Sequence, residues 1–305
     1  MERVGELLAQ THGELLVSKY RLRQAEGIAL VRQRRDEGRQ NLGFNSRPFV
    51  LCGLPLRRPP RDNLLFERRN GSFVLQVTGH PEFGLPFGQD RLVPIFLATL
   101  AVRQQSQTIR FKSASVMLET FGMSKGGKEY RRLVAAFERI FGATIFFGTD
   151  SVSAPIRVVH RSRFNFLREA TIWYQRDGGE AGENVVTLSD EFFAEVTAHP
   201  IPTDLEAVKV LAAAPGVLDL FVWLSYRCFT ARGTEEIPIF GNYGLVRQLG
   251  CIEYSRPRRF LAMQDQWLQA IRTVWPDCPA KVVPGIPSLR IAHSSPIPRS
   301  GCNLA

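Results

Sequence analysis

The clearest periodic pattern of apolar and polar positions in this 305-residue chain runs from Gly127 to Phe141. Its apolar residues recur at the i, i+3, i+4 and i+7 spacing of one helical face, which predicts an amphipathic helix with one buried side. The opposite side is basic, and an exposed basic face suits a groove lined with phosphates. The residues assigned to it are Lys128, Arg131, Arg132 and Arg139, with Lys125 in the turn before them.

Shorter patterns flank this helix over Gln107 to Arg163. Thr108 to Phe111 is a strand candidate, Ser115 to Phe121 is a short helix, and glycines mark the turn between the two helices. Downstream, Ala143 to Phe147 and Ile156 to His160 are β-rich runs joined by a turn-rich connector. Strand, helix, turn, basic helix and two-stranded ribbon is the order of a winged helix-turn-helix. The further basic residues assigned to this unit are Lys112, Arg157 and Arg161.

A charged face opposite an apolar one is also typical of ordinary surface helices. A second copy of the same order of elements therefore strengthens the DNA-binding interpretation. The order helix, strand, helix, long helix and hairpin returns after residue 215. The predicted elements are Gly216–Ala231, Ile237–Phe240, Tyr243–Leu249, Pro257–Trp275, Lys281–Val283 and Ser288–Ala292. Recognition helices present their first turns to base edges. The second set of candidate DNA-binding residues is therefore Arg256, Arg258 and Arg259.

The predicted fold class is α+β, with two tandem winged helix-turn-helix domains and a flexible or helical N-terminal extension. Residues 1–44 form the extension, with weak helical periodicity followed by a flexible basic segment from Arg32 to Arg39. Residues 45–176 form the first winged domain, which opens with a small β element. Its strands are predicted at Pro48–Leu54, Leu64–Arg69 and Phe73–Thr78.

The stretch from Asp177 to Glu206 differs from the rest because it holds eight acidic residues and no Lys or Arg. Such a stretch is unsuited to lie along DNA, so residues 177–206 are predicted to be a hinge region. Within it, Ser189 is expected to cap a short helix. Residues 207–305 then form the second winged domain.

Composition agrees with a folded protein that binds a polyanion. The chain is 44% hydrophobic, and its formal net charge is +10, carried mostly by Arg. The five cysteines are scattered without a C-x-x-C pair, which argues against a disulfide framework and a zinc site and favours a reducing cytoplasm. No apolar run reaches the roughly 18 residues of a transmembrane helix.

An ordered set of short motifs resembles the plasmid-encoded replication initiators of the RepA type. The motifs are Leu54 to Pro60, Phe66 to Gly71, Gly84 to Arg91, Ala101 to Arg103 and Ala214 to Leu220, and the resemblance runs from about residue 48 to the end. It implies a protein that recognises repeated double-stranded sites at its own plasmid origin and helps to open it. It also implies host partners, the host replication initiator and helicase, and related initiators form homodimers that repress their own gene.

Two other classes are weighed against this hypothesis. A winged-helix transcriptional repressor would use the same domains at a promoter. A P-loop nucleotide-binding protein is suggested by Gly122 to Lys128, which fits G-x-x-x-x-G-K, but Glu129 stands where a Ser or Thr should bind magnesium and a helix precedes the motif. The five histidines are far apart and no catalytic motif appears, so neither an enzyme, a metal site nor a cofactor is expected.

Overall fold

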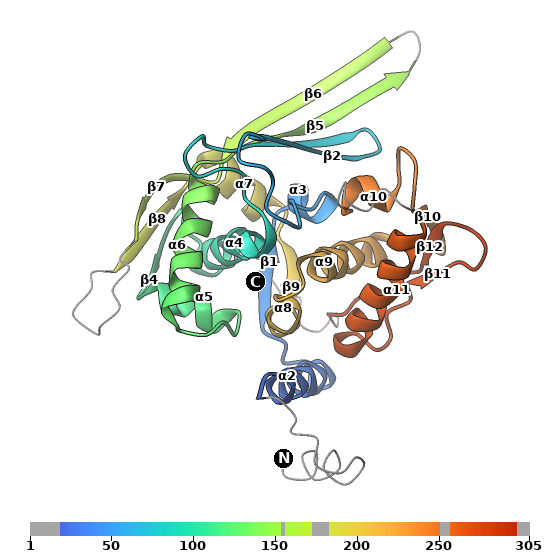
Figure 1. Cartoon of the computed structure of the whole chain (residues 1–305), viewed down its shortest axis with the longest axis horizontal. Coiled ribbons are helices and arrows are strands. Elements are labelled where there is room, and N and C mark those ends of the chain that lie inside the picture. The colour runs from blue at the N-terminus through green and yellow to red at the C-terminus, as the bar shows by residue number, and fades with distance from the viewer. Residues whose placement is uncertain (1–18, 154–155, 173–182, 251–256, 298–305) are drawn as a thin grey trace.

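The computed structural model describes residues 19–153, 156–172, 183–250 and 257–297. It has the mixed α+β fold that the sequence predicts, with several small antiparallel sheets among helices (Figure 1). We call residues 54–198 the first lobe and residues 215–297 the second lobe. One continuous hydrophobic core runs through both lobes and the segments between them.

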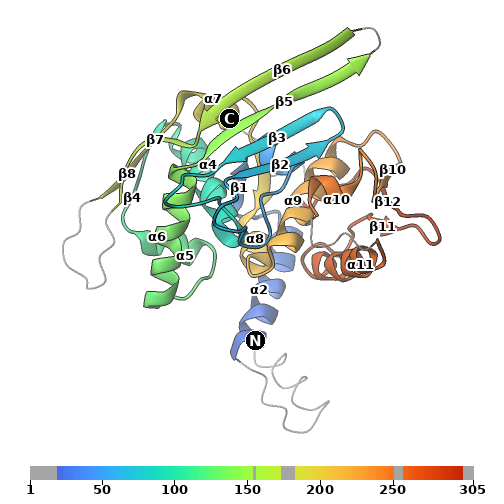
Figure 2. The ribbon, with the colours of Figure 1, turned by 45° about the horizontal axis from the view of Figure 1, so that its top comes forward.

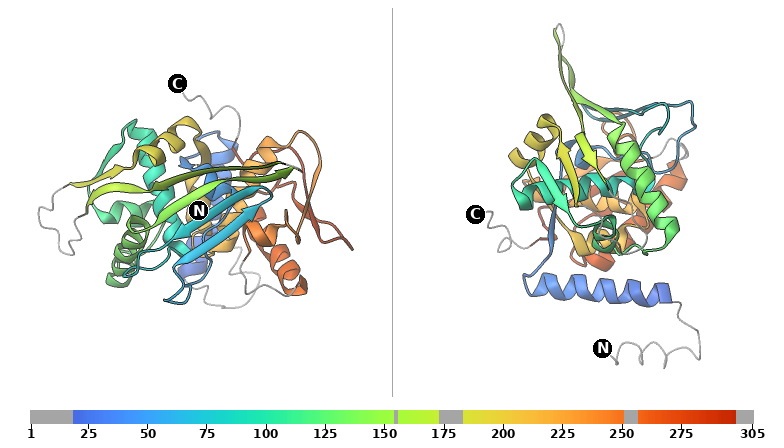
Figure 3. Two further views of the ribbon diagram at one scale, coloured as in Figure 1. Left: turned by 90° about the horizontal axis from the view of Figure 1, so that it is seen from above. Right: turned by 90° about the vertical axis from the view of Figure 1, so that its left-hand side faces the viewer.

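A four-stranded antiparallel sheet in the order β2-β3-β5-β6 lies along one side of the first lobe, and Figure 2 shows its strands side by side. Its strands are β2 (Leu65–Asn70), β3 (Phe73–Thr78), β5 (Thr144–Ser153) and β6 (Ile156–Asn165). The predicted hairpin of β2 and β3 is confirmed. The predicted ribbon is confirmed but longer, because β5 and β6 stay paired over their whole length and project beyond β2 and β3 (Figure 3).

A second sheet of the first lobe has the order β4-β8-β7, from β4 (Thr108–Phe111), β7 (Leu167–Thr171) and β8 (Asn184–Leu188). The acidic segment therefore supplies the central strand of a sheet as well as helix α7 (Asp190–Ala198). As expected, Ser189 caps α7, since its hydroxyl accepts a hydrogen bond from the Phe192 amide at 3.1 Å. The role of residues 177–206 as a hinge stays a prediction.

The helices of the first lobe surround one buried helix, α4 (Leu92–Gln104), whose residues are almost all apolar. A short 3-10 turn, η1 (Gly88–Arg91), leads into it, and α5 (Ala114–Thr120) and α6 (Gly127–Phe141) follow β4. The predicted bounds of α6 are confirmed. Phe96 of α4 packs edge-on against Phe111 of β4 and against Phe121, the residue after α5, so these aromatic contacts fix β4 and the end of α5 to the core.

The middle of the molecule joins segments far apart in sequence. Strand β1 (Leu42–Asn45) pairs antiparallel with β9 (Ile201–Asp204), and α8 (Leu205–Leu211) follows directly. The predicted strand at Pro48–Leu54 is wrong, because the structure has helix α3 (Arg47–Leu51) there. Pro48 lies in the first turn of α3, where its missing amide hydrogen is not needed.

The second lobe follows the predicted order of elements. Helix α9 (Pro215–Thr230) and helix α11 (Pro257–Val274) pack together, with α10 (Leu245–Gln248) before the latter. The sheet has the order β10-β12-β11, from β10 (Glu235–Pro238), β11 (Lys281–Val282) and β12 (Ser288–Ile291). The two lobes meet at a buried ion pair, in which Arg91 of η1 contacts Asp219 of α9.

Candidate nucleic-acid interface

Helix α6 is fixed by its apolar face and exposes basic residues on the other. Leu133, Phe137 and Ile140 of the predicted apolar face are buried together with Ala136. Phe141, which the sequence analysis places on the same face, is 46% exposed at the end of the helix. Lys128, Arg131 and Arg132 are exposed in the first two turns. The structure therefore brings these three basic residues together on one face of a well-anchored helix.

The basic residues near α6 differ in whether a carboxylate neutralises them. Lys125 contacts Glu119, and this hydrogen bond raises the pKa of Lys125. Arg132 lies 3.4 Å from Glu129, one turn earlier on the helix. Lys112, Lys128 and Arg131 are exposed and make no ion pair within the described part of the chain. Among the predicted residues near α6, these three carry a charge that no described carboxylate neutralises.

Arg139 corrects the sequence analysis, which placed it on the exposed basic face. Its Nε and Nη2 atoms donate to the two oxygens of Asp90 at 2.6 and 2.9 Å. Its guanidinium also lies 4.7 Å from the centre of the Phe87 ring. The side chains of Arg139 and Asp90 are only 12% and 5% exposed, so Arg139 holds α6 against η1 and is not part of an exposed surface.

The ribbon carries the candidates Arg157 and Arg161 on its return strand. The register pairs Arg157 with Val152 and Arg161 with Gly148, and their side chains lie outside what the structure describes. Arg163, which pairs with Phe146, is exposed.

The second lobe offers a smaller described set. Arg256 lies outside the described residues, while Arg258 and Arg259 are exposed in the first turn of α11. Phe260, the next residue, is fully buried and fixes this end of the helix in the core. Arg258 and Arg259 are therefore at the position that the sequence analysis assigned to them.

The basic segment near the N-terminus is not the flexible arm that the sequence predicts. Helix α2 (Lys19–Asp36) extends through it, and three of its arginines bind other parts of the chain. Arg32 donates to the Thr273 carbonyl at 2.8 Å, Arg34 pairs with Glu206 at 3.1 Å, and Arg35 pairs with Asp277 at 2.8 Å. These arginines tie α2 to α8, to the C-terminal end of α11 and to the segment that follows it.

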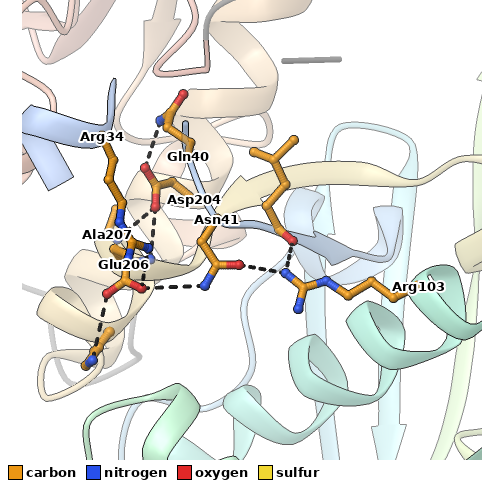
Figure 4. A network of polar contacts seen from close by, with 9 residues as sticks. Arg34, Gln40, Asn41, Arg103, Asp204, Glu206 and Ala207 are labelled. Atoms are coloured by element: carbon orange, nitrogen blue, oxygen red, sulfur yellow. Dashed lines mark hydrogen bonds and ion pairs between the residues drawn. The ribbon is translucent and has the colours of Figure 1, made fainter. Parts of the chain in front are cut away.

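Figure 4 shows the polar network that continues from α2 into the middle of the fold. Gln40 donates to Asp204 at 2.7 Å, and Arg103 at the end of α4 donates to Asn41 at 2.7 Å. Asp204 also caps α8, because it accepts from the amides of Glu206 and Ala207, and its burial raises its pKa. The network thus connects α2, β1, α4 and α8.

The chemistry of nucleotide hydrolysis or metal binding has no support in the described residues. The Gly122–Lys128 motif lies between helices α5 and α6, whereas a P-loop follows a strand. Burial raises the pKa of Cys52 and of Cys228 to about 12, so neither thiol is activated. Within the described ranges no cluster of His, Cys, Asp and Glu is suited to a metal ion.

None of the described helices is long and apolar enough to cross a membrane.

Comparison with known proteins gives one family match. Residues 55–205 match the family model described as "Replication initiator protein A". No curated protein matches the chain. Two crystal structures of domains 2 and 3 of RctB are similar to it, both at a TM-score of 0.49. One is 14% identical over 73% of this chain and 82% of the solved RctB fragment, and the other is 16% identical over 70% of this chain and 80% of its solved fragment.

Proposed function

Because residues 55–205 match the Replication initiator protein A family model, we propose that this chain is a sequence-specific, double-stranded-DNA-binding plasmid replication initiator. It binds repeated sites at the plasmid origin in the cytoplasm, helps to open it, and recruits host replication proteins such as the host initiator and helicase. It does so without a catalytic site or a cofactor. The family match supports the initiator role, and the net charge of +10 supports a polyanionic partner.

The proposal depends most on the exposed and unneutralised basic residues of α6. Lys128 and Arg131 are exposed in its first two turns and are not neutralised by any described carboxylate, while the opposite face is anchored in the core. A helix enters the major groove with its first turns toward the base edges. In this pose Lys128 and Arg131 reach the groove, and Lys112, Lys125 and Arg132 lie near its phosphates.

The second lobe supplies the second half of the interface in this proposal. Its element order and its sheet order β10-β12-β11 are those of a single strand beside a hairpin, as in a winged domain. Arg256, Arg258 and Arg259 then approach a second groove about one helical turn of DNA away. Arg157 and Arg161 of the ribbon contact the backbone or the minor groove beside the first site.

The test is the binding of the full chain to tiled DNA fragments that flank its gene, measured by fluorescence anisotropy at about 150 mM salt with competitor DNA. We expect tight binding to a fragment with tandem repeats, and a loss of about ten-fold or more for Lys128→Ala with Arg131→Ala. The matched control is Arg110→Ala with Arg168→Ala, which removes the same charge from residues paired with Glu183 and Asp190.

Each result of this experiment has a definite meaning. Tight binding at a promoter without tandem repeats would replace the initiator by a repressor that uses the same surface. Uniform weak binding to all fragments would contradict a sequence-specific role. An equal loss in both double variants, with an unchanged fold by circular dichroism, would remove α6 from the interface. Binding of a nucleotide that Lys128→Ala abolishes would favour the P-loop hypothesis instead.

A further inference from the structure

A cleft open to solvent lies between two loops of the first lobe, Pro55 to Leu64 and Gly79 to Gly88. Backbone hydrogen bonds join the loops at both ends, from Gly88 to the Pro55 carbonyl at 2.9 Å and from Gly79 to the Leu64 carbonyl at 2.8 Å. The cleft between these closures has a volume of about 200 Å³. Small-molecule sites have roughly 300–1,000 Å³, so this one fits a single ring system better than a whole cofactor.

The cleft is preformed by residues that restrict the backbone. Pro59, Pro60 and Pro81 line it, and each ring fixes its own φ angle. Gly84 adopts a φ of +81°, which side chains other than that of glycine rarely allow, and its amide donates to the His80 carbonyl at 2.7 Å. A ligand therefore meets a wall that is already ordered, which lowers the entropic cost of binding.

Two half-buried aromatic rings form part of this wall. Phe83 stacks on the His80 ring with centroids 4.7 Å apart, and Phe87 is covered by the Arg139 guanidinium at 4.7 Å. Each ring is thus held in place by a partner while it lines the cleft. Flat aromatic surfaces of this kind stack well with the bases of single strands.

Positive charge lies at the same cleft. Arg58 and Arg61 line it, are exposed, and make no ion pair with the residues that the structure describes. Among the lining residues, Glu82 alone carries a carboxylate. Guanidinium groups bind phosphates with two parallel hydrogen bonds and also stack on bases. The cleft therefore combines a stacking surface with unneutralised phosphate-binding groups.

We propose that this cleft binds one unpaired nucleotide, with its base on Phe83 and Phe87 and its phosphate on Arg58 and Arg61. The inference rests on the proposed function, since it concerns the strand that an opened origin would offer. A base inside an intact duplex is stacked and paired and cannot enter such a cleft. The ligand is therefore a nucleotide of a single strand, or a free nucleotide of the same chemistry.

The cleft lies within reach of a strand whose duplex part is bound by α6. Arg139, which covers Phe87, is eleven residues after Lys128 on the same helix. At 1.5 Å per residue this is about 17 Å along the axis. A DNA strand advances 3.4 Å per nucleotide, so about five nucleotides separate the first turns of α6 from the cleft.

The test compares single-stranded and duplex binding by the full chain. A short fluorescent oligothymidylate and the specific duplex are titrated at the same salt concentration with wild type, Arg58→Ala with Arg61→Ala, and Phe83→Leu. We expect each variant to bind the oligothymidylate about ten-fold more weakly and the duplex within two-fold of wild type. Phe83→Leu keeps an apolar side chain against Gly142, and equal melting temperatures check that the fold is retained.

The control variants separate the failure of this inference from that of the proposed function. Arg110→Ala with Arg168→Ala should leave oligothymidylate binding within two-fold of wild type. If the duplex binds but neither cleft variant changes oligothymidylate binding, or if only Lys128→Ala with Arg131→Ala weakens it, the inference is overturned. If wild type does not bind any duplex specifically, the proposed function fails, whatever the cleft does.

Two further measurements complete the assignment. Ultraviolet cross-linking of an oligonucleotide with iodinated deoxyuridine should label the peptide that contains Phe83, and labelling confined to other peptides would contradict the site. If thymidine monophosphate at the same nucleotide concentration displaces the fluorescent oligothymidylate, free nucleotides are the ligand of this cleft. If only unlabelled oligothymidylate displaces it, the ligand is a strand.

Discussion

Helices α2 and α6 are both rich in arginine, yet their basic residues are in different electrostatic states. On α2, Arg32, Arg34 and Arg35 bind a carbonyl or a carboxylate of the same chain. On α6, Lys128 and Arg131 have no such partner among the described residues. The comparison teaches that the number of positive charges on a helix does not identify a DNA-binding surface. What matters is whether the protein has already neutralised them.

The largest effect is expected for Arg139, the arginine of α6 that is paired with a carboxylate, as Arg34 and Arg35 of α2 are. Arg139→Ala leaves the Asp90 carboxylate buried without its partner, and breaking a buried pair costs about 3–5 kcal/mol. Urea denaturation should show a fall of this size in the free energy of unfolding, whereas Arg131→Ala should change it by less than about 0.5 kcal/mol. A stable Arg139→Ala variant with weakened DNA binding would put Arg139 back into the interface.

The next effect concerns the unpaired residues of α6. If Lys128 and Arg131 contact phosphates, their removal reduces the number of counterions released on binding. The slope of log affinity against log salt concentration should then be smaller by about two for Lys128→Ala with Arg131→Ala. The slope is measured by anisotropy titrations at several salt concentrations. An unchanged slope together with weaker binding would indicate base contacts in place of phosphate contacts.

A smaller effect is expected on α2. Arg34→Ala with Arg35→Ala removes two charges, as in the α6 variant, but these charges are paired with Glu206 and Asp277. DNA affinity should stay within two-fold of wild type. The free energy of unfolding should fall by about 1 kcal/mol, since the pairs are partly exposed and screened by solvent. A ten-fold loss of DNA affinity without destabilisation would contradict the distinction between the two helices.

The smallest effect is expected for Arg110→Ala with Arg168→Ala. Both side chains are more than half exposed. Arg110 pairs with Glu183, just before β8, and Arg168 pairs with Asp190, the first residue of α7. Exposed pairs of this kind contribute about 0–1 kcal/mol each. Thermal unfolding followed by circular dichroism and DNA titration should both give values close to wild type. A large loss of affinity here would show that binding follows net charge alone.

Much of the fold could be predicted where the local pattern is strong. The bounds of α6 follow from a sharp alternation of apolar and basic positions, and the hairpin of β2 and β3 follows from an Asn-Gly turn between two β-rich runs. The prediction of a strand at Pro48–Leu54 is wrong because a short apolar run cannot be assigned to strand or helix from periodicity alone. Helix α2 gave a weak signal because polar contacts with distant segments hold much of it in place.

The candidate site shows the same division. The exposed residues of α6 could be found because their exposure follows from the helix they lie on. The state of Arg139 could not, since its partner Asp90 is 49 residues away in the chain. Arg58 and Arg61 flank a Pro-Pro pair, which is a sequence sign of an ordered basic loop. Only the pairing of two loops shows that they share a cleft.

The pairing of β1 with β9 has a consequence for how the chain folds during synthesis. Leu42 to Asn45 find their partners at Ile201 to Asp204, roughly 160 residues later. At a translation rate of about 5–20 residues per second, the N-terminal segment waits roughly 10–30 seconds for that strand. The first lobe can begin to form in this interval, and β1 can already pack on α4, where the Phe44 amide donates to Thr99. Helix α2 has no docking site yet, because it contacts α8 and α11. Helix α2 therefore joins the molecule late, after most of the core that it crosses has been made.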